Sequence, residues 1–161
     1  MTAARKDTTR NSIDSDHRAL LELLENITPD QWSTPVYTEE ESDNWTVRTV
    51  FAHLANAATG LLGTAQAVSA GYDPVPPDFN LTRRNQRVIG KSAIVPDSTI
   101  VERINTGYDQ WIVFLCEIPE AHLDRTGHHA SGQVLSVEEL FMHYARHEAH
   151  HASDIRDALE K

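Results

Sequence analysis

The 161-residue chain contains a single cysteine, Cys116, which excludes an intrachain disulfide and a cluster of thiolate metal ligands. Cys116 follows Leu115 in a stretch with helical apolar spacing, so we interpret it as a packing residue rather than a nucleophile. Basic residues are also few, because 14 Lys and Arg stand against 24 Asp and Glu, for a formal net charge of −10. A nucleic-acid-binding protein needs a basic surface to displace counterions from phosphates. The charge balance therefore predicts no nucleic-acid partner.

The chain also lacks an apolar run long enough to cross a membrane. Its most apolar stretch, residues 50–70, is broken by polar side chains such as His53 and Asn56 and contains two glycines. Residues 1–10 are polar and lack the apolar centre of a signal peptide. We therefore expect a cytoplasmic protein with no membrane partner. The apolar fraction of 40% and the length suit one domain over residues 1–161.

Apolar residues recur at helical spacing in four segments, and no strand pattern competes with them. The first predicted helix covers about residues 8–26 and is followed by a turn through Trp32, which we expect to pack onto the other helices. An acidic loop is predicted over residues 38–44. The second helix is predicted to start near Thr46 and to end at Gly71, because glycine suits the position after a helix C-terminus.

The connection formed by residues 72–96 is long and rich in proline, and we expect one short helix within it, over about residues 81–88. The third predicted helix begins at Thr99 and stops before Pro119, and the fourth runs from Ser136 to the end of the chain. Both openings match the capping box, in which Ser or Thr is followed three residues later by Glu. Together these segments predict an all-α fold, a four-helix bundle with a long connection between helices two and three.

Histidines are concentrated near the C-terminus, where four of the nine lie within nine residues: His143, His147, His150 and His151. Residues four apart lie on one face of a helix, one turn apart, so two such imidazoles can grip a single metal ion. His151 lies near the centre of the apolar stripe of the last helix and His147 lies on its flank. We therefore predict that this pair points inward, while His143 and His150 are solvated.

A third ligand must come from another helix, and His53 is the best candidate. Its neighbours on the inner face of the second helix are small (Ala57, Gly60 and Thr64), which leaves room for a metal ion with an open coordination position. A helical pair at this spacing also occurs in proteins that bind no metal, so the spacing alone leaves both interpretations open.

Several other charged or titratable side chains have less certain roles. His17 lies on the apolar face of the first helix, where we expect a hydrogen-bonded place in the core, with reach to the pocket as the alternative. Three further histidines are expected at the surface: His122, His128 and His129. One basic cluster, formed by Arg83, Arg84 and Arg87, is expected to be a solvated face, although it could attract an acidic substrate.

Glu148 lies close to the centre of the apolar stripe, where a carboxylate must be paired, protonated or bound to metal. We predict that it belongs to the site as a catalytic residue. Residues 147–151 match the H-E-x-x-H motif of zinc proteases. The context argues against a protease, because the sequence ends ten residues later and no predicted strand could bind a peptide. A di-iron carboxylate bundle needs two E-x-x-H motifs with further carboxylates. Because the second predicted helix has no Asp or Glu, the sequence argues against a di-iron protein.

Two blocks of the sequence resemble the DinB-like superfamily. The first is residues 21–57, with the stretch from Ile27 to Trp32 and the stretch from Asn44 to Leu54 as its clearest parts. It is especially similar to the N-terminal domain found in mycothiol-dependent maleylpyruvate isomerases. The second block, residues 135–155, resembles the closing helix of DinB-like proteins. Together they cover under half of the chain, in the right order and at opposite ends.

The resemblance implies a four-helix bundle that binds one divalent metal ion, most simply zinc or nickel, through His53, His147 and His151. The isomerases have glutamate where this chain has His147, which places the chain nearer the general DinB-like group. The family further implies a transferase that uses a low-molecular-weight thiol, such as mycothiol or bacillithiol, against a small electrophile, and it implies a homodimer.

Metal coordination lowers the pKa of a thiol, so the bound thiolate can attack at neutral pH. We expect Glu148 or Asp154 to be the carboxylate that fixes the tautomer of a ligand histidine; Asp154 lies three residues beyond His151. Two alternatives stay open, a metal-dependent hydrolase at the same site and a non-enzymatic helical stress or binding module.

Overall fold

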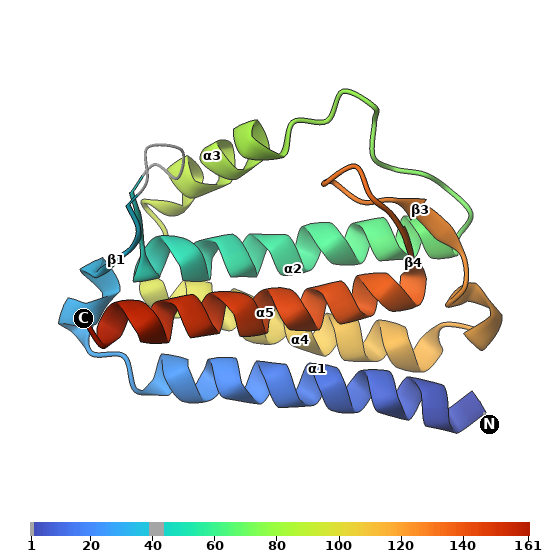
Figure 1. The fold of residues 1–161 in the computed structure, drawn as a ribbon, viewed down its shortest axis with the longest axis horizontal. Helices are drawn as coiled ribbons and strands as arrows, with labels where there is room; N and C mark the ends of the chain where they lie inside the picture. Colours follow the sequence, from blue (N-terminus) through green and yellow to red (C-terminus); the bar gives the residue numbers. More distant parts are fainter. Residues whose placement is uncertain (1, 39–43) are drawn as a thin grey trace.

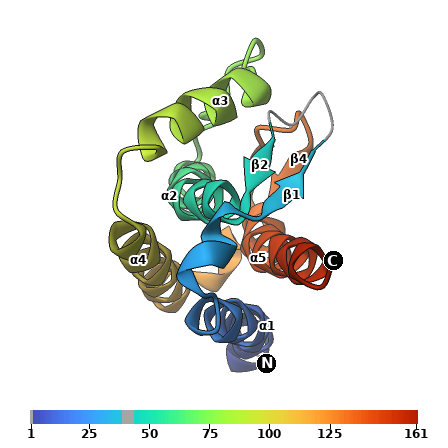
Figure 2. The ribbon, with the colours of Figure 1, turned by 90° about the vertical axis from the view of Figure 1, so that its left-hand side faces the viewer.

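The computed structural model describes residues 2–38 and 44–161, and four long helices form its main body (Figure 1). They are α1 (Thr2–Glu25), α2 (Val47–Ser69), α4 (Asp97–Glu117) and α5 (Val137–Leu159). The fold is a four-helix bundle, as the apolar spacing predicted. Viewed along the bundle, the helices follow the order α1, α5, α2, α4 around a shared core (Figure 2).

The connection between the second and third long helices determines the topology. It contains α3 (Leu81–Ser92) and returns along the outside of α2, so α2 and α4 run in the same direction and α5 runs opposite to both (Figure 1). The predicted short helix over residues 81–88 is thus present and is four residues longer. Because α3 packs mainly against α2 among the long helices, it covers one side of the bundle rather than joining it.

Local capping accounts for several helix ends. Thr46 caps α2 by accepting a hydrogen bond from the backbone N–H of Thr49 at 3.3 Å, and Gly71 follows the helix with a φ of +88° that favours glycine. Ser136 and Glu139 form the predicted capping box at the start of α5. The capping box predicted at Thr99 is wrong, because α4 begins at Asp97, where the extended Pro96 precedes the first turn.

The prediction that no strands are present is also wrong, since two short antiparallel hairpins precede α2 and α5. They pair β1 (Pro35–Tyr37) with β2 (Trp45–Thr46) and β3 (Thr126–His128) with β4 (Val134–Ser136). Strands of two or three residues are too short for apolar alternation to show in a sequence. Two 3₁₀ turns, Pro29–Ser33 and Glu120–His122, complete the described elements. The predicted acidic loop lies mainly at residues 39–43, outside the described residues.

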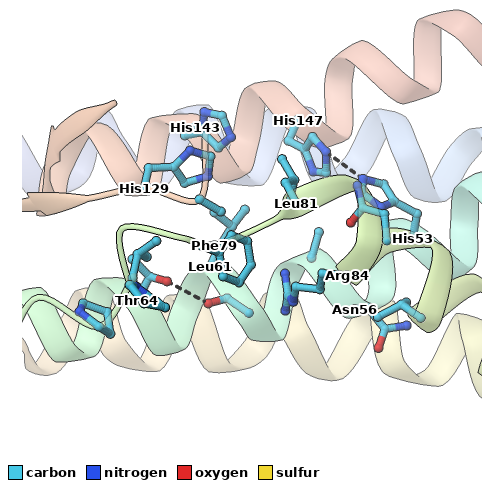
Figure 3. A pocket seen from close by; sticks show the side chains of 18 residues that line it. His53, Asn56, Leu61, Thr64, Phe79, Leu81, Arg84, His129, His143 and His147 are labelled. Carbon is cyan, nitrogen blue, oxygen red and sulfur yellow. Dashed lines mark hydrogen bonds between the residues drawn. The ribbon is translucent and has the colours of Figure 1, made fainter. Parts of the chain in front are cut away.

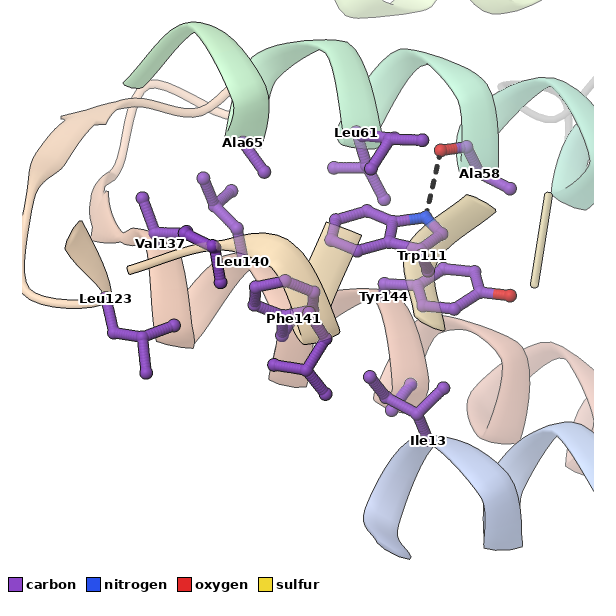
Figure 4. Close-up of a cluster of buried hydrophobic side chains, with 14 of the residues drawn as sticks. Ile13, Ala58, Leu61, Ala65, Trp111, Leu123, Val137, Leu140, Phe141 and Tyr144 are labelled. Carbon is purple, nitrogen blue, oxygen red and sulfur yellow. Dashed lines mark hydrogen bonds between the residues drawn. The ribbon is translucent and has the colours of Figure 1, made fainter. Parts of the chain in front are cut away.

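Buried apolar side chains form two clusters, and the first contains Trp111 of α4, whose side chain is fully buried. Its indole stacks on Tyr144 of α5 with ring centroids 4.8 Å apart, and its Nε1–H donates to the carbonyl of Ala58 on α2 at 3.1 Å (Figure 4). One side chain therefore joins three helices by stacking and by hydrogen bonding. The 3₁₀ turn packs onto the bundle through Trp32, which contacts Phe51 as expected. Across the described residues, no helix is both long and apolar enough to traverse a membrane.

Candidate metal centre

Three histidines from two neighbouring antiparallel helices meet near the β1–β2 end of the bundle. His53 comes from the second turn of α2, and His147 and His151 lie one turn apart on α5. The Nε2 atom of His147 lies 3.0 Å from Nε2 of His53 and 3.2 Å from Nε2 of His151. One ring nitrogen from each residue lies within 4.8 Å of the others. The structure thus brings together the three side chains predicted as ligands.

Burial keeps these imidazoles neutral. His53 and His151 are each only 9% exposed, and His147 is half-buried. Burial, followed by repulsion from His147 and Arg84, lowers the pKa of His53 to about 3. Burial and the neighbouring histidines lower the pKa of His147 to about 3 and that of His151 to about 4. Near neutral pH each ring therefore has one unprotonated nitrogen available for a metal ion.

Tyr37 and Asp154 set the tautomer of His151. The Tyr37 hydroxyl donates its one proton to the Asp154 carboxylate in a short hydrogen bond. It also lies 2.7 Å from Nδ1 of His151, so that ring nitrogen must be the donor in this second contact. Nδ1 then carries the proton of the neutral ring, and Nε2 presents a lone pair to the other two histidines. Asp154 thus reaches His151 through Tyr37.

The donor set suits a divalent ion. The Nε2 atoms of three neutral imidazoles converge, and that of His151 presents a lone pair. Lone pairs on converging nitrogens repel one another unless a cation or a proton lies between them. Zinc and nickel both accept imidazole ligands, and three protein ligands leave a coordination position open. The aromatic rings of Trp45 and Tyr37 border the cluster, with centroids 5.0 Å from His53 and 5.9 Å from His151 respectively.

Glu148 lies outside this group and is hydrogen-bonded within the core. Its carboxylate accepts from Nδ1 of His17 at 3.0 Å and from the hydroxyl of Tyr144 at 2.8 Å, and it is only 3% exposed. His17 is itself stacked on Tyr108 with centroids 4.1 Å apart. The prediction of a hydrogen-bonded core histidine is therefore correct for His17. The catalytic role predicted for Glu148 stays a prediction.

A cavity of about 320 Å³ adjoins the histidine cluster. His53 and His147 line one end, α2 forms its floor, and α3 with the preceding loop covers it (Figure 3). The opposite end is lined by His129, which follows β3, and by His143 of α5. The rings of these two histidines have centroids 4.4 Å apart. The histidine cluster thus opens onto a space that a small molecule can enter.

Sequence reasoning missed several side chains around this cavity. His143 was expected in solvent and His129 at the surface, yet His143 is half-buried and His129 is only 6% exposed. Both line the cavity because the β3–β4 hairpin folds over the start of α5, a contact that helical spacing cannot reveal. The contact of Tyr37 with His151 could not be predicted either, because Tyr37 lies in a strand of three residues, too short to show a pattern in the sequence. His150 and His128 are exposed, as predicted.

Comparison with known proteins gives a family and several solved structures of the same fold. The family model described as the DinB superfamily matches residues 12–155. No curated protein matches the chain. YfiT from Bacillus subtilis, described as a probable metal-dependent hydrolase with an unusual four-helix bundle topology, is 18% identical with a TM-score of 0.75. The alignment covers 96% of this chain and 86% of YfiT.

Two further structures extend the comparison. The colibactin self-resistance protein ClbS, solved in complex with double-stranded DNA, is 14% identical with a TM-score of 0.78, over 97% of this chain and 96% of ClbS. The mycothiol-dependent maleylpyruvate isomerase is 16% identical with a TM-score of 0.73. That match covers 96% of this chain but only 60% of the isomerase.

At identities of 14–18%, these structures show only that the fold is shared. The DNA bound to ClbS therefore does not test the prediction that this chain has no nucleic-acid partner. The family match covers most of the residues that build the bundle and all three converging histidines. The chain therefore belongs to the DinB superfamily, as its two terminal blocks indicated.

Proposed function

We propose that this protein is a metal-dependent enzyme that transfers a low-molecular-weight thiol to a small electrophile. The observation that carries the proposal is the convergence of three neutral imidazoles beside a cavity. Nε2 of His147 lies 3.0 Å from Nε2 of His53 and 3.2 Å from Nε2 of His151. His53, His147 and His151 would hold one divalent ion, zinc or nickel by the chemistry of the ligands. The similarity in fold to a mycothiol-dependent isomerase supports the choice of a thiol as co-substrate.

The roles of the residues follow from their positions. Tyr37 and Asp154 keep Nε2 of His151 unprotonated, and the Trp45 ring packs against the His53 ring. A bound divalent ion would lower the pKa of a coordinated thiol and so supply a thiolate at neutral pH. The thiol proton would pass to solvent, the sulfur would form a bond to an electrophilic carbon held in the cavity, and the leaving group would depart with its electron pair. The histidine ligands themselves stay unchanged through this reaction.

The proposal is tested by metal content and by thiol dependence together. Purified protein should contain about one zinc or nickel ion per chain by elemental analysis, and H147A should lose it. H128A is the matched control, because His128 is an exposed histidine paired with Asp73, outside the metal-ligand group. With an aryl halide as electrophile, mycothiol or bacillithiol should be consumed only by the metal-loaded wild type and H128A. Absence of bound metal, or equal rates with H147A, would contradict the proposal.

A second candidate function is hydrolysis at the same centre. Its support is the fold shared with YfiT, which is described as a probable metal-dependent hydrolase. The same ion could then activate water in place of a thiol. An ester or amide substrate cleaved without thiol, with the same loss in H147A, would favour the hydrolase. A protein that binds no metal and turns over neither substrate would favour the non-enzymatic module.

A further inference from the structure

We propose that Arg84 makes the cavity beside the histidine cluster selective for small molecules that bear an acidic group, a carboxylate or a phosphate. Such a group would pair with the Arg84 guanidinium while the rest of the molecule lies toward His53 and His147. The inference rests on the proposed function in that the cavity is taken as the substrate site. It adds the chemical class of the substrate and a residue that selects it.

Among the described residues, the lining of the cavity carries no negative charge. The chain has 24 acidic residues and a net charge of −10, yet no Asp or Glu is among the described residues that line this space. The polar side chains that the described part of the chain places at the wall are instead histidines, amides and one hydroxyl, and Arg84 is the only permanent charge among them. An anion entering the cavity therefore meets no like charge from these residues, and it meets one fixed opposite charge.

Arg84 differs from the other arginines of the described chain. It is half-buried, and no carboxylate or carbonyl of the described residues accepts a hydrogen bond from its guanidinium. Arg5 and Arg48, also half-buried, are paired with Glu138 and Asp97 respectively. All remaining arginines, including Arg83 and Arg87 on the same helix, are exposed. A partly desolvated guanidinium without an acceptor is satisfied by an anionic ligand.

Gly60 positions this guanidinium. A Cβ atom at residue 60 would overlap the Arg84 guanidinium, so the side chain from α3 lies directly on the backbone of α2 at a place that only glycine leaves open (Figure 3). The small residues expected to leave space for the metal thus also admit an arginine. Gly60 lies on the same face of α2 as His53, two turns further along.

The spacing along α2 sets the size of the ligand. At about 1.5 Å per residue, Gly60 lies roughly 10 Å beyond His53 along the helix axis. The cavity volume of about 320 Å³ is at the small end for ligand sites. A molecule with an acidic group at Arg84 could therefore reach the histidine cluster with a reactive carbon only a few bonds away. Compact aromatic or aliphatic acids fit this description.

Binding of three small probes to the metal-free protein tests the inference. Chelated wild-type protein is titrated by calorimetry with benzoate, phenyl phosphate and benzamide, which share a ring and differ in the acidic group. Because charge-assisted hydrogen bonds are worth more than neutral ones, we expect at least one acid to bind about tenfold or more tightly than benzamide. The stronger of the two acids identifies a carboxylate or a phosphate as the preferred group.

Variants of α3 and α2 assign the selectivity to Arg84. R84Q should remove the preference for the acid, and R84K should keep part of it. G60A retains the arginine but displaces it, so it should also weaken acid binding. R83Q is the matched control, since Arg83 is an exposed neighbour on the same helix. Circular dichroism and thermal melts verify that each variant is folded.

Equal binding of acid and amide, no detectable binding of either acid, or a preference that survives in R84Q would overturn the inference. All measurements use metal-free protein and no thiol. Their result is therefore independent of whether the chain binds metal or consumes thiol, so failure of this inference and failure of the proposed function can be told apart.

Discussion

Nδ1 of His151 lies 2.7 Å from the phenolic oxygen of Tyr37, so a helix near the C-terminus is joined to a strand 114 residues earlier in the chain. Asp154, one turn beyond His151, accepts the proton of the same hydroxyl. Tyr37 therefore links the carboxylate to the imidazole and fixes which nitrogen faces the other two histidines. Burial and the Asp154 carboxylate raise the pKa of Tyr37, so it stays a phenol and a donor.

The first prediction concerns this link. Y37F removes the only acceptor that the described residues offer to Nδ1 of His151, so the ring loses its fixed orientation and tautomer. We expect zinc affinity to fall by about 10- to 100-fold, measured by competition with a chromophoric chelator. Y108F is the matched control, because the Tyr108 hydroxyl donates to Asp14, away from the three ligands. Unchanged affinity in Y37F would show that Tyr37 does not orient the ligand.

The second prediction concerns metal-linked stability. A ligand that binds only the folded state stabilises it by about 2.7 kcal/mol when its concentration is 100 times its dissociation constant. Zinc or nickel should therefore raise the melting temperature of chelator-treated wild type, measured by calorimetry, and H53A should show no such rise. H128A should respond as the wild type does. An equal rise in H53A would place the stabilising metal elsewhere.

The third prediction is the pH dependence of the metal-free protein. The pKa values of His53 and His147 are lowered to about 3 and that of His151 to about 4, against about 6.5 in an unfolded chain. As pH falls below 6.5, the unfolded state takes up protons that the folded state does not, so the free energy of unfolding decreases. The stabilisation is complete above pH 6.5 and is lost as pH falls toward the folded-state values.

Urea denaturation between pH 7.5 and 5 measures this slope, because few carboxylates titrate in that range. H53L removes one of the buried imidazoles and should give a shallower dependence than wild type. The comparison measures the titration of His53 together with its repulsive effect on the pKa of His151, because the other histidines are present in both proteins. A slope that is identical in the two proteins would mean that His53 is not held neutral by burial.

The fourth prediction separates a structural role of Glu148 from a catalytic one. E148A leaves His17 and Tyr144 buried without their shared acceptor. At about 1–3 kcal/mol for each unsatisfied donor, we expect a loss of roughly 2–6 kcal/mol in the free energy of unfolding, measured by urea denaturation. E148Q keeps an acceptor and should fold with full metal content. Loss of thiol-dependent turnover in metal-loaded E148Q would support the catalytic role, and unchanged turnover would leave Glu148 a core residue.

Much of the fold could be predicted because it depends on local patterns. The starts of α2 and α5 follow from Thr46 and Ser136, whose side chains cap the next turn whatever packs around them. Thr99 shows the limit of such patterns, since Pro96 allowed α4 to begin two residues earlier. The hairpins could not be predicted, because their stability comes from packing against α2 and α5 rather than from their own few residues.

The candidate site divides in the same way. Spacing alone placed His147 and His151 on one face of one helix, because a helix repeats every 3.6 residues in any protein. Spacing could not supply His53 as their partner. The choice of His53 used the family resemblance and the small neighbours on its helix. In the structure, the packing of α2 beside α5 brings His53 next to the pair.

The amino-acid sequence was sufficient to predict the long helices, the histidine pair on the last helix and the family. Each of these depends on residues that lie close together in the chain or on a motif that can be recognised in the sequence. Tertiary structure alone decided that Tyr37 orients His151, that Glu148 turns to His17, and that Arg84 faces the cavity while Arg83 faces solvent. The physical reason is that burial and hydrogen-bond partners of a side chain are set by the elements packed against it. In this chain those elements lie tens of residues away or more.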